Sequence, residues 1–351
     1  MSDRYQICKT CFVTSQFPNS NINETGQCQW CRSNDIEKKL FHDDGIKYDE
    51  LMDLAEAIKK ERTGKYDCVI GVSGGLDSSY MAYIAGKIMG LNALLVHYDH
   101  GFYYQRPKEN LKALATSLGL EIHEFQSKKN WDKRFLKTFM KAFEKSKYYF
   151  GVCTFCHYIL PAVIVKVGKE KGIKYYISHR NQYELSLKVP RKVKRDALLD
   201  SIFSNGIKQL PKTLFFLILA TYCLFRLKIE YYVPPIKNLL KSAPKKTFKE
   251  INLSKYVPWK TERMVEDLVR NTGWKLPDHP NLGMRFDCMI EDSLMDLSYK
   301  KATGLSIHGI IANNLIYDGV KNKNDLIPAI NYYNDNIEDA VLQLKKRVFD
   351  E

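Results

Sequence analysis

The sequence predicts an α/β fold, in which a doubly wound parallel sheet follows a small cysteine-rich lobe and precedes a helical C-terminal region. Three observations predict this arrangement. Strand patterns alternate with helix patterns between residues 66 and 178, as they do in proteins with a parallel sheet. A glycine-rich turn follows the first strand pattern, and two CxxC pairs stand ahead of it. From Trp259 onward the apolar residues recur at helical spacing.

The expected elements follow one another in a regular order. A helix is expected over residues 46–65, a strand over 66–71, a glycine-rich turn over 72–79, and a helix from Tyr80. The remaining strands are expected at 93–99, 121–125 and 174–178, and the helices between them at 110–118, 131–149 and 158–171. This alternation is the basis for expecting helices on both faces of the sheet.

The composition of the chain limits the classes of protein to which it can belong. The chain has 351 residues, of which 45% are hydrophobic and 27% charged, so it is globular and not disordered. Its nine cysteines come without a secretory leader, which indicates a reducing compartment, and we expect a cytoplasmic location.

Of the net charge of +14, the stretch 188–250 contributes +10, because it holds 14 Lys/Arg and 4 Asp/Glu. This basic region predicts an anionic partner or substrate, such as tRNA or phospholipid, or else a solvated surface.

We expect four regions in the chain. They are a zinc-binding lobe (1–40), an ATP-binding α/β domain (41–187), a basic and apolar insertion (188–255) and a helical C-terminal region (256–351). The helices of the last region are expected at 262–272, 293–303, 307–317, 326–333 and 337–348.

The insertion contains an apolar run at residues 213–227 with basic residues on both sides. Its twelve to fourteen apolar residues are too few for a bilayer span, which needs about 20. A buried helix or a contact between subunits of an oligomer is one interpretation. A helix lying on a membrane surface, a peripheral contact, is the other.

The first cysteine set has the spacing of a zinc site. Cys8, Cys11, Cys28 and Cys31 form two CxxC pairs separated by sixteen residues that are rich in turn formers. Four thiolates leave no coordination position open for water, so the predicted role of the zinc is structural. It would fold a lobe that is too small to have a core of its own.

The glycine-rich turn has the composition of a phosphate-binding loop. Glycines let the backbone approach an anion, and the first N–H groups of the following helix point at it. The predicted ligand-binding residues of the turn are Ser73, Gly74, Gly75, Asp77, Ser78 and Ser79. No Lys follows the glycines, so the turn is not the GK[ST] loop of nucleoside triphosphatases. Asp99 and His179 end later strand patterns and should lie at the same edge of the sheet.

The string Ser-Gly-Gly-Leu-Asp-Ser resembles the pyrophosphate loop of the PP-loop ATP pyrophosphatase superfamily, whose members have a HUP-like fold and split ATP into AMP and pyrophosphate. Together with the cysteine lobe, residues 5–125 resemble the N-acetyl sugar amidotransferases of bacterial surface-polysaccharide synthesis, and a looser likeness returns over 287–326. The resemblance implies ATP-dependent conversion of a sugar acetamido or carboxamide group to an amidine, with ammonia from a separate glutaminase subunit.

The chemistry expected of such a site is activation of a poor electrophile. Adenylation of an amide carbonyl oxygen creates an AMP leaving group, after which a neutral nucleophile can attack. Ser73 and the other donors of the turn would bind the departing pyrophosphate. Asp77 would bind Mg²⁺ or order the loop, and Asp99 would meet the nucleoside or act as a turn residue.

A second cysteine set departs from that resemblance. Cys153, Cys156 and the distant Cys288 are similar to the three cysteines with which PP-loop tRNA thiolases hold an iron–sulfur cluster, such as [4Fe-4S], that carries sulfide. Three alternatives remain open: a second zinc site with His157 or His279, a dithiol that relays persulfide sulfur, and two cysteines without a ligand. The segment after His179 lacks the paired aspartates of the thiolases.

The sequence therefore predicts an AMP-forming ligase that uses ATP, Mg²⁺ and zinc, resembles amidotransferases and acts on an N-acetylated or carboxamide sugar. An iron–sulfur sulfurtransferase acting on tRNA or a small molecule is the alternative within the superfamily. A non-catalytic nucleotide-binding partner protein is the alternative outside it. Near Cys288, polar residues could line an anionic substrate pocket, namely Asp278, His279 and Arg285. Trp259 and Trp274 are expected to be packing residues.

Overall fold

A five-stranded parallel sheet forms the centre of the molecule, with the strand order β3-β2-β1-β4-β5. The strands are β1 (Cys68–Gly71), β2 (Ala93–Tyr98), β3 (Glu121–Phe125), β4 (Tyr175–Ser178) and β5 (Lys249–Asn252). The chain builds outward from β1 through β2 to β3 and then returns to the other side of β1 with β4. That reversal is the switch point of a doubly wound sheet, which confirms the predicted fold class.

The computed structural model describes residues 5–33, 45–179, 191–203, 210–231, 248–317 and 319–350. Its α-helices are α1 (Gln29–Arg32), α2 (Tyr48–Lys60), α3 (Leu76–Tyr83), α4 (Gln105–Leu118), α5 (Trp131–Ala142), α6 (Thr154–Glu170), α7 (Arg191–Phe203), α8 (Leu210–Tyr231), α9 (Thr261–Thr272), α10 (Asp296–Thr303), α11 (Ile307–Tyr317) and α12 (Lys323–Phe349). The expected boundaries near residues 40 and 187 lie outside the described residues.

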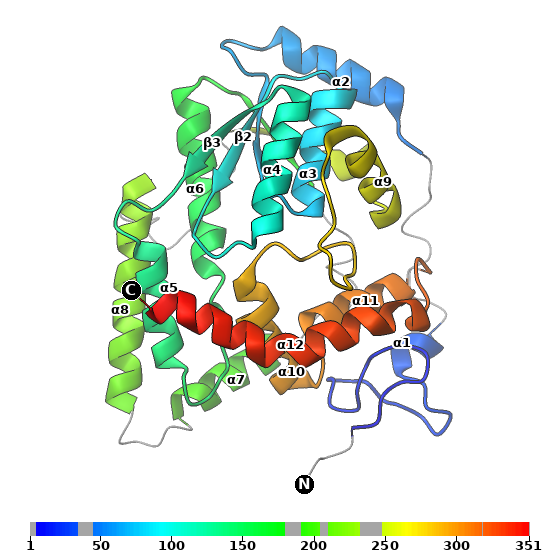
Figure 1. Ribbon diagram of the computed structural model, residues 1–351, viewed down its shortest axis with the longest axis vertical. Helices are drawn as coiled ribbons and strands as arrows, with labels where there is room; N and C mark the ends of the chain where they lie inside the picture. The colour runs from blue at the N-terminus through cyan, green and yellow to red at the C-terminus, as the bar shows by residue number, and fades with distance from the viewer. Residues whose placement is uncertain are drawn as a thin grey trace.

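Helices cover both faces of the sheet because its strand residues alternate in direction (Figure 1). Cys68 and Ile70 point to one face, where they pack with α2, α3, α4 and α9. Val69 between them points to the other face, where it packs with α5 and α6. Strands β1 and β2 are buried almost throughout, as expected for the middle of a parallel sheet.

Three elements differ from the sequence prediction. A single helix, α12, replaces the two helices predicted at 326–333 and 337–348, since the polar Asn334–Asn336 stretch continues the helix. Strand β5 lies within the segment predicted as an insertion, so part of that segment completes the sheet. Helix α8 has 22 residues, and by length and composition its residues Leu210–Glu230 could cross a bilayer, so the prediction that this run is too short is wrong.

The N-terminal lobe, residues 5–33, packs against the C-terminal helices, which are far from it in sequence (Figure 1). Phe17 and the buried cysteines of the lobe share a core with Leu305, Ile310 and Tyr317. Backbone and side-chain hydrogen bonds fix this contact: the Phe12 N–H donates to Asn313 Oδ1 at 2.7 Å, and Lys323 Nζ donates to the Cys8 carbonyl at 2.7 Å. The two ends of the chain are therefore joined in one structural unit.

Candidate functional site

The turn between β1 and α3 is a tight loop, and only glycine fits at one of its positions. We call Ser73–Ser79 the phosphate loop. Gly74 has a φ of +84°, and a Cβ atom built on it would lie 2.0 Å from the carbonyl oxygen of Pro107. Any side chain at Gly74 would therefore displace either the loop or the start of α4. The indole N–H of Trp274 also donates to the Gly74 carbonyl at 3.1 Å.

The hydroxyl groups of the phosphate loop converge. Ser73 Oγ and Ser78 Oγ lie 3.2 Å apart, and the Ser73 N–H donates to Ser78 Oγ at 3.0 Å. The Gly75 N–H lies 3.3 Å from Ser73 Oγ. Gly75 is the residue before α3, so the loop places these donors at the N-terminus of that helix. This is the arrangement of donors that binds phosphate at a helix terminus. Ser79, by contrast, is fully buried.

Asp77 is held at the mouth of this loop by two aromatic residues. Trp259 Nε1 donates to Asp77 Oδ1 at 2.7 Å, and His179 Nε2 lies 3.9 Å from the same oxygen. The His179 ring stacks on Trp259 with 5.1 Å between the ring centroids. The structure thus brings together Ser73, Asp77 and His179, as the sequence predicts. The indole N–H groups of Trp259 and Trp274 both donate hydrogen bonds to the loop. The prediction that these two residues serve only in packing is therefore incomplete.

Asp99 also lies at the carboxyl edge of the sheet, immediately after β2, where neighbouring groups bind its carboxylate. It accepts hydrogen bonds from the Gly101 N–H at 2.8 Å, from Lys108 Nζ at 2.7 Å and from Gln126 Nε2 at 3.1 Å. Burial raises the pKa of Asp99, but the Lys108 ammonium and the Gly101 N–H outweigh it, and the net pKa lies below the usual range. Asp99 is therefore ionised and orders the β2–α4 connection. Its contact with a nucleoside stays a prediction.

The C-terminal region also supplies a carboxylate, that of Asp287, to the phosphate loop. The sequence does not predict Asp287 as a site residue. A Cβ on Gly75 would lie 3.1 Å from Asp287 Oδ2, and the Asp287 carboxyl is hydrogen-bonded to Ser73. Burial, reinforced by the charge of Glu291, raises the pKa of Asp287 to about 6. The segment is fixed by an isolated bridge between Tyr103 and Cys288. Only its place next to Cys288 in the sequence could have indicated Asp287.

The second cysteine set lies beside this segment. Cys153, Cys156 and Cys288 belong to the same apolar cluster, although more than 130 residues separate Cys156 from Cys288. Burial raises the pKa of both Cys156 and Cys288 well above the usual range. The charge of Glu291 raises both further, as does Cys153, and Cys156 also raises the pKa of Cys288. The three cysteines therefore lie close enough, beside Asp287, for their charges to interact.

An imidazole that the sequence does not suggest, that of His100, lies beside Cys288. Its Nε2 lies 4.0 Å from Cys288 Sγ, and its ring stacks on Tyr103 at 4.2 Å. Burial lowers the pKa of His100 to about 3, so the ring is neutral. His157 is exposed, and His279 stacks on Tyr332. In the described part of the chain, neither joins Cys153 and Cys156 in a group tight enough for a single ion, which leaves the second-zinc alternative without support.

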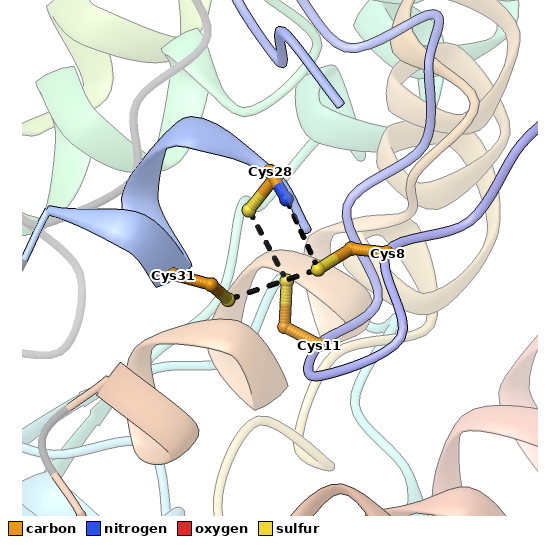
Figure 2. A group of neighbouring side chains, drawn as sticks. All are labelled: Cys8, Cys11, Cys28 and Cys31. Carbon is orange, nitrogen blue, oxygen red and sulfur yellow. Dashed lines mark hydrogen bonds between the residues drawn. The ribbon is translucent and has the colours of Figure 1, made fainter. Parts of the chain in front are cut away.

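The first cysteine set forms a compact four-sulfur group (Figure 2). The ligand atoms of Cys8, Cys11, Cys28 and Cys31 all lie within 4.8 Å of one another. Cys8 Sγ and Cys31 Sγ are 3.8 Å apart, and Cys11 Sγ and Cys28 Sγ are 3.7 Å apart. A tetrahedron with metal–sulfur bonds of about 2.3 Å has edges of about 3.8 Å. The group thus fits one four-coordinate metal ion, as the sequence predicts.

Bonds around this group orient the sulfur atoms. The Cys28 N–H donates to Cys8 Sγ at 3.3 Å, and the Tyr317 hydroxyl lies 3.3 Å from Cys11 Sγ. Tyr317 belongs to α11, so the metal site also ties the N-terminal lobe to the C-terminal helices.

A pocket of about 690 Å³ lies beside the Asp287 segment. Its apolar walls are the rings of Tyr104, Phe286, Tyr332 and Tyr333, and Asp292 and Asn336 contribute polar groups. Asp278 and His279 line it as well, and their contact with a substrate stays a prediction. Arg285 lies outside the pocket lining and pairs with Glu291 at 2.6 Å. Phe286 lines the pocket while the next residue meets Ser73, so pocket and phosphate loop are neighbours.

Comparison with known proteins identifies the domain that carries the phosphate loop. The family model described as NAD synthase, a family of the PP-loop superfamily, matches residues 48–148. Residues 48–148 thus resemble a PP-loop domain. The match covers α2 through α5 and therefore includes the whole PP-loop, Ser73–Ser79.

Two curated relatives also align with part of the chain. The glutamine-hydrolyzing GMP synthase of Pyrobaculum aerophilum is 30% identical over 86 residues, which are 24% of this chain and 17% of the relative. The same enzyme of Aeropyrum pernix is 40% identical over 73 residues, which are 21% of this chain and 14% of the relative. The chain thus matches less than a fifth of the length of each.

Among solved structures, an NH3-dependent NAD synthetase from Campylobacter jejuni shares 15% identity with a TM-score of 0.31, and the match covers 54% of this chain and 96% of that one. The U34-tRNA thiolase NcsA from Methanococcus maripaludis, solved with its [4Fe-4S] cluster, shares 15% identity with a TM-score of 0.34, covering 95% of this chain and 87% of that one.

Proposed function

We propose that this protein is an ATP-dependent, AMP-forming ligase that adenylates a carbonyl oxygen for attack by ammonia. The observation that carries the proposal is the PP-loop itself. Its Ser73 and Ser78 hydroxyls converge at the start of α3, and Asp77 is held beside them by Trp259. These donors would bind the β- and γ-phosphates and the departing pyrophosphate. Mg²⁺, bound through Asp77, would supply charge neutralisation of the phosphates.

The pocket beside the PP-loop supports an N-acetylated or carboxamide sugar as the acceptor. Sugars expose C–H faces that pack on aromatic rings and hydroxyls that bond to carboxylates and amides. Tyr332 and Tyr333 offer the rings, and Asp292 and Asn336 offer the polar groups. A ligand there would lie next to Asp287, whose carboxyl is hydrogen-bonded to Ser73. Burial of Asp292 raises its pKa well above the usual range, which favours a neutral carboxyl that can donate to a sugar oxygen.

Ammonia as the nucleophile is supported by the curated relatives, whose names describe glutamine-hydrolyzing enzymes. We propose that a separate glutaminase subunit delivers ammonia to this chain. The test is a reaction of the full chain with ATP, Mg²⁺, ammonium and a panel of N-acetylated sugars labelled with ¹⁸O in the carbonyl. Transfer of the ¹⁸O to AMP is expected. AMP without the label would show that the carbonyl oxygen does not attack the α-phosphate.

A matched pair of variants ties the reaction to the pocket. Tyr332→Leu removes a ring from the pocket and should raise the KM for the acceptor while leaving the KM for ATP unchanged. Tyr299→Leu, on α10 outside the pocket, is the control and should change neither. If Tyr332→Leu changes only the KM for ATP, the acceptor does not bind in this pocket.

Sulfur transfer is a second candidate function, and the cysteine cluster favours it. Cys153, Cys156 and Cys288 lie together next to Asp287 at the PP-loop, where an iron–sulfur cluster could present sulfide to an adenylated carbonyl, on tRNA or on a small molecule. Each thiolate of such a cluster binds a different iron, so their sulfurs lie farther apart than around one ion. Anaerobically purified protein that is brown and contains iron would favour this function. Colourless protein that contains only zinc would favour ammonia.

We also propose that the metal of the N-terminal lobe is zinc. The tetrahedral spacing of four thiolates and the absence of room for a water ligand in a Cys₄ set support a structural ion. Metal analysis of the purified protein tests this assignment, with about one zinc per chain expected.

A further inference from the structure

Helix α8 presents a continuous apolar stripe to solvent. Phe215 and Ile218 are 56% and 68% exposed, although such residues are usually buried. Further along the helix, the stripe continues at intervals of three or four residues, so its members share one face. The exposed apolar residues of α8 are Leu214, Phe215, Ile218, Tyr222, Phe225 and Ile229. Figure 1 shows α8 at the left edge of the molecule, with one long side beside α5.

The opposite side of α8 belongs to the core of the protein. Ala220, Cys223 and Leu227 are buried in the cluster that α5 and α6 also build. Near its C-terminal end, Glu230 Oε2 accepts hydrogen bonds from Ser127 Oγ at 3.1 Å and from the Lys128 N–H at 3.2 Å. Polar bonds and a packed face fix the helix along the protein surface, so only one stripe of it is available for a partner.

Positive charge borders the apolar stripe. The stretch 128–147, which includes α5, holds eight Lys/Arg and two Asp/Glu, and one of these acids, Asp132, is buried. Arg134 and Arg226 both lie over the Trp131 ring, at 4.8 Å and 5.3 Å from its centroid. Lys141 lies 5.6 Å from the ring centroid of Phe216 on α8. The basic residues of α5 therefore reach the apolar helix itself.

We propose that this face, formed by the apolar stripe of α8 and the basic side chains of α5, binds the surface of an anionic phospholipid membrane. Helix α8 lies in the plane of the interface, with Phe215 and Ile218 inserted among the acyl chains and the Lys and Arg side chains at the headgroups. Contact with a second copy of the same face is disfavoured because it would bring two basic borders together. Crossing of the bilayer is disfavoured because the bonds of Glu230 and the packed side of α8 would have to be broken.

The test is co-sedimentation of the full chain with sucrose-loaded vesicles. One set of vesicles is phosphatidylcholine alone, and the other also contains phosphatidylglycerol. The protein is expected to bind the mixed vesicles at least about tenfold more tightly, and high salt should weaken this binding. Alkaline carbonate should release it, because the helix lies on the membrane and does not cross it. Equal binding to both vesicles, binding to neither, or retention after carbonate would each overturn the proposal.

Two variants and one control locate the surface. The double variant Phe215→Glu with Ile218→Glu should lose vesicle binding by about tenfold or more, as should Arg134→Gln with Lys141→Gln. Val269→Glu, at an exposed apolar position on α9, should bind like the wild type. Thermal unfolding of each variant checks that it is folded. If folded Phe215→Glu with Ile218→Glu retains full vesicle binding, or if its only change is loss of a concentration-dependent dimer, the membrane surface is not the partner.

Discussion

At the scale of single residues, the site depends on one glycine and two indole N–H groups. Gly74 brings the PP-loop against the carbonyl of Pro107, and Trp274 holds the Gly74 carbonyl from the other side. Trp259 orients Asp77. Both tryptophans come from the C-terminal region, so that region completes a loop whose sequence motif lies 180 residues earlier or more. A PP-loop motif by itself therefore describes only part of the site.

We expect Gly74→Ala to abolish ATP binding. The added Cβ would lie 2.0 Å from Pro107 O, so the loop must leave its phosphate-binding conformation. Gly119→Ala is the matched control, because Gly119 also has a positive φ, +64°, but a Cβ there meets nothing within 4 Å. Calorimetric titration with ATP and Mg²⁺ measures both variants. If both variants lose ATP affinity equally, backbone strain at a positive φ is the cause, and not the clash between the PP-loop and Pro107.

Trp259→Phe should weaken ATP·Mg²⁺ binding or turnover by about tenfold to a hundredfold. It removes a hydrogen bond to the charged Asp77, and such bonds contribute about 1.5–3 kcal/mol. Trp131→Phe is the control, because the Trp131 ring packs edge-on against Tyr222 of α8. The measurement is the same titration, followed by pyrophosphate release. Wild-type affinity and rate in Trp259→Phe would mean that the hydrogen bond from Trp259 is not needed to position Asp77.

At the scale of elements, buried polar contacts decide how the C-terminal segments meet the PP-loop domain. His308, in α11, donates through Nδ1 to Asp296 Oδ2 at 2.5 Å and through Nε2 to the Arg285 carbonyl at 3.0 Å. Arg285 has a φ of +52°, which is uncommon for a residue with a side chain. The imidazolium therefore fixes a strained backbone two residues before Asp287, and so positions the segment that meets Ser73.

The pH dependence of stability should reveal this imidazolium. Burial alone lowers the pKa of His308, but the Asp296 carboxylate outweighs it and raises the pKa to about 9. Protonated His308 contributes its full stabilisation of the folded state below about pH 6.5, the pKa of a histidine in the unfolded chain. This stabilisation is lost as the pH rises through about 9, the pKa in the folded state. Urea unfolding of the wild type and of His308→Gln between pH 6 and 10 (roughly the range in which this group titrates) checks this. The wild type should lose more stability across the range, and parallel curves would contradict the assignment.

The sequence predicts local elements well and long-range contacts poorly. The strands, the alternation of helices and the four zinc-type cysteines could be predicted, because periodicity and short spacings carry that information. Strand β5 was missed because only four residues form it after a long interruption. Asp287 and His100 were missed because their roles come from tertiary contacts with Ser73 and Cys288, which no local pattern encodes. The break predicted inside α12 reflects polar residues that the helix tolerates.

At the scale of the whole molecule, the two ends of the chain support the domain between them. The N-terminal lobe packs on α11 and bonds to α12 through Lys323, while the residues before α10 reach the PP-loop. The lobe and these helices lie side by side in Figure 1. The metal site of the lobe is therefore linked to the PP-loop through α11, α10 and the segment that carries Asp287. Its role in this account is to stabilise those helices and not to take part in the reaction.

Removal of the metal should unfold the lobe and loosen the C-terminal helices. Structural zinc contributes about 10 kcal/mol or more to small domains of this kind. Cys11→Ser should give protein with less than one zinc, and hydrogen exchange should show faster exchange in residues 5–33 and in α11. Tyr317→Phe, which removes the hydroxyl beside Cys11 and leaves the four thiols, should retain the metal. Unchanged exchange in metal-free protein would contradict a structural role.

The most direct measurement for the central claim is the identity of the nucleotide formed from ATP. The full chain is incubated with α-labelled ATP, Mg²⁺, ammonium and the panel of N-acetylated and carboxamide sugars, and the labelled products are separated. The account predicts AMP, with an equal amount of pyrophosphate, and no product in Ser73→Ala, whose hydroxyl lies between Ser78 and Gly75 in the PP-loop. Formation of ADP and phosphate, or AMP formation that Ser73→Ala leaves unchanged, would contradict it.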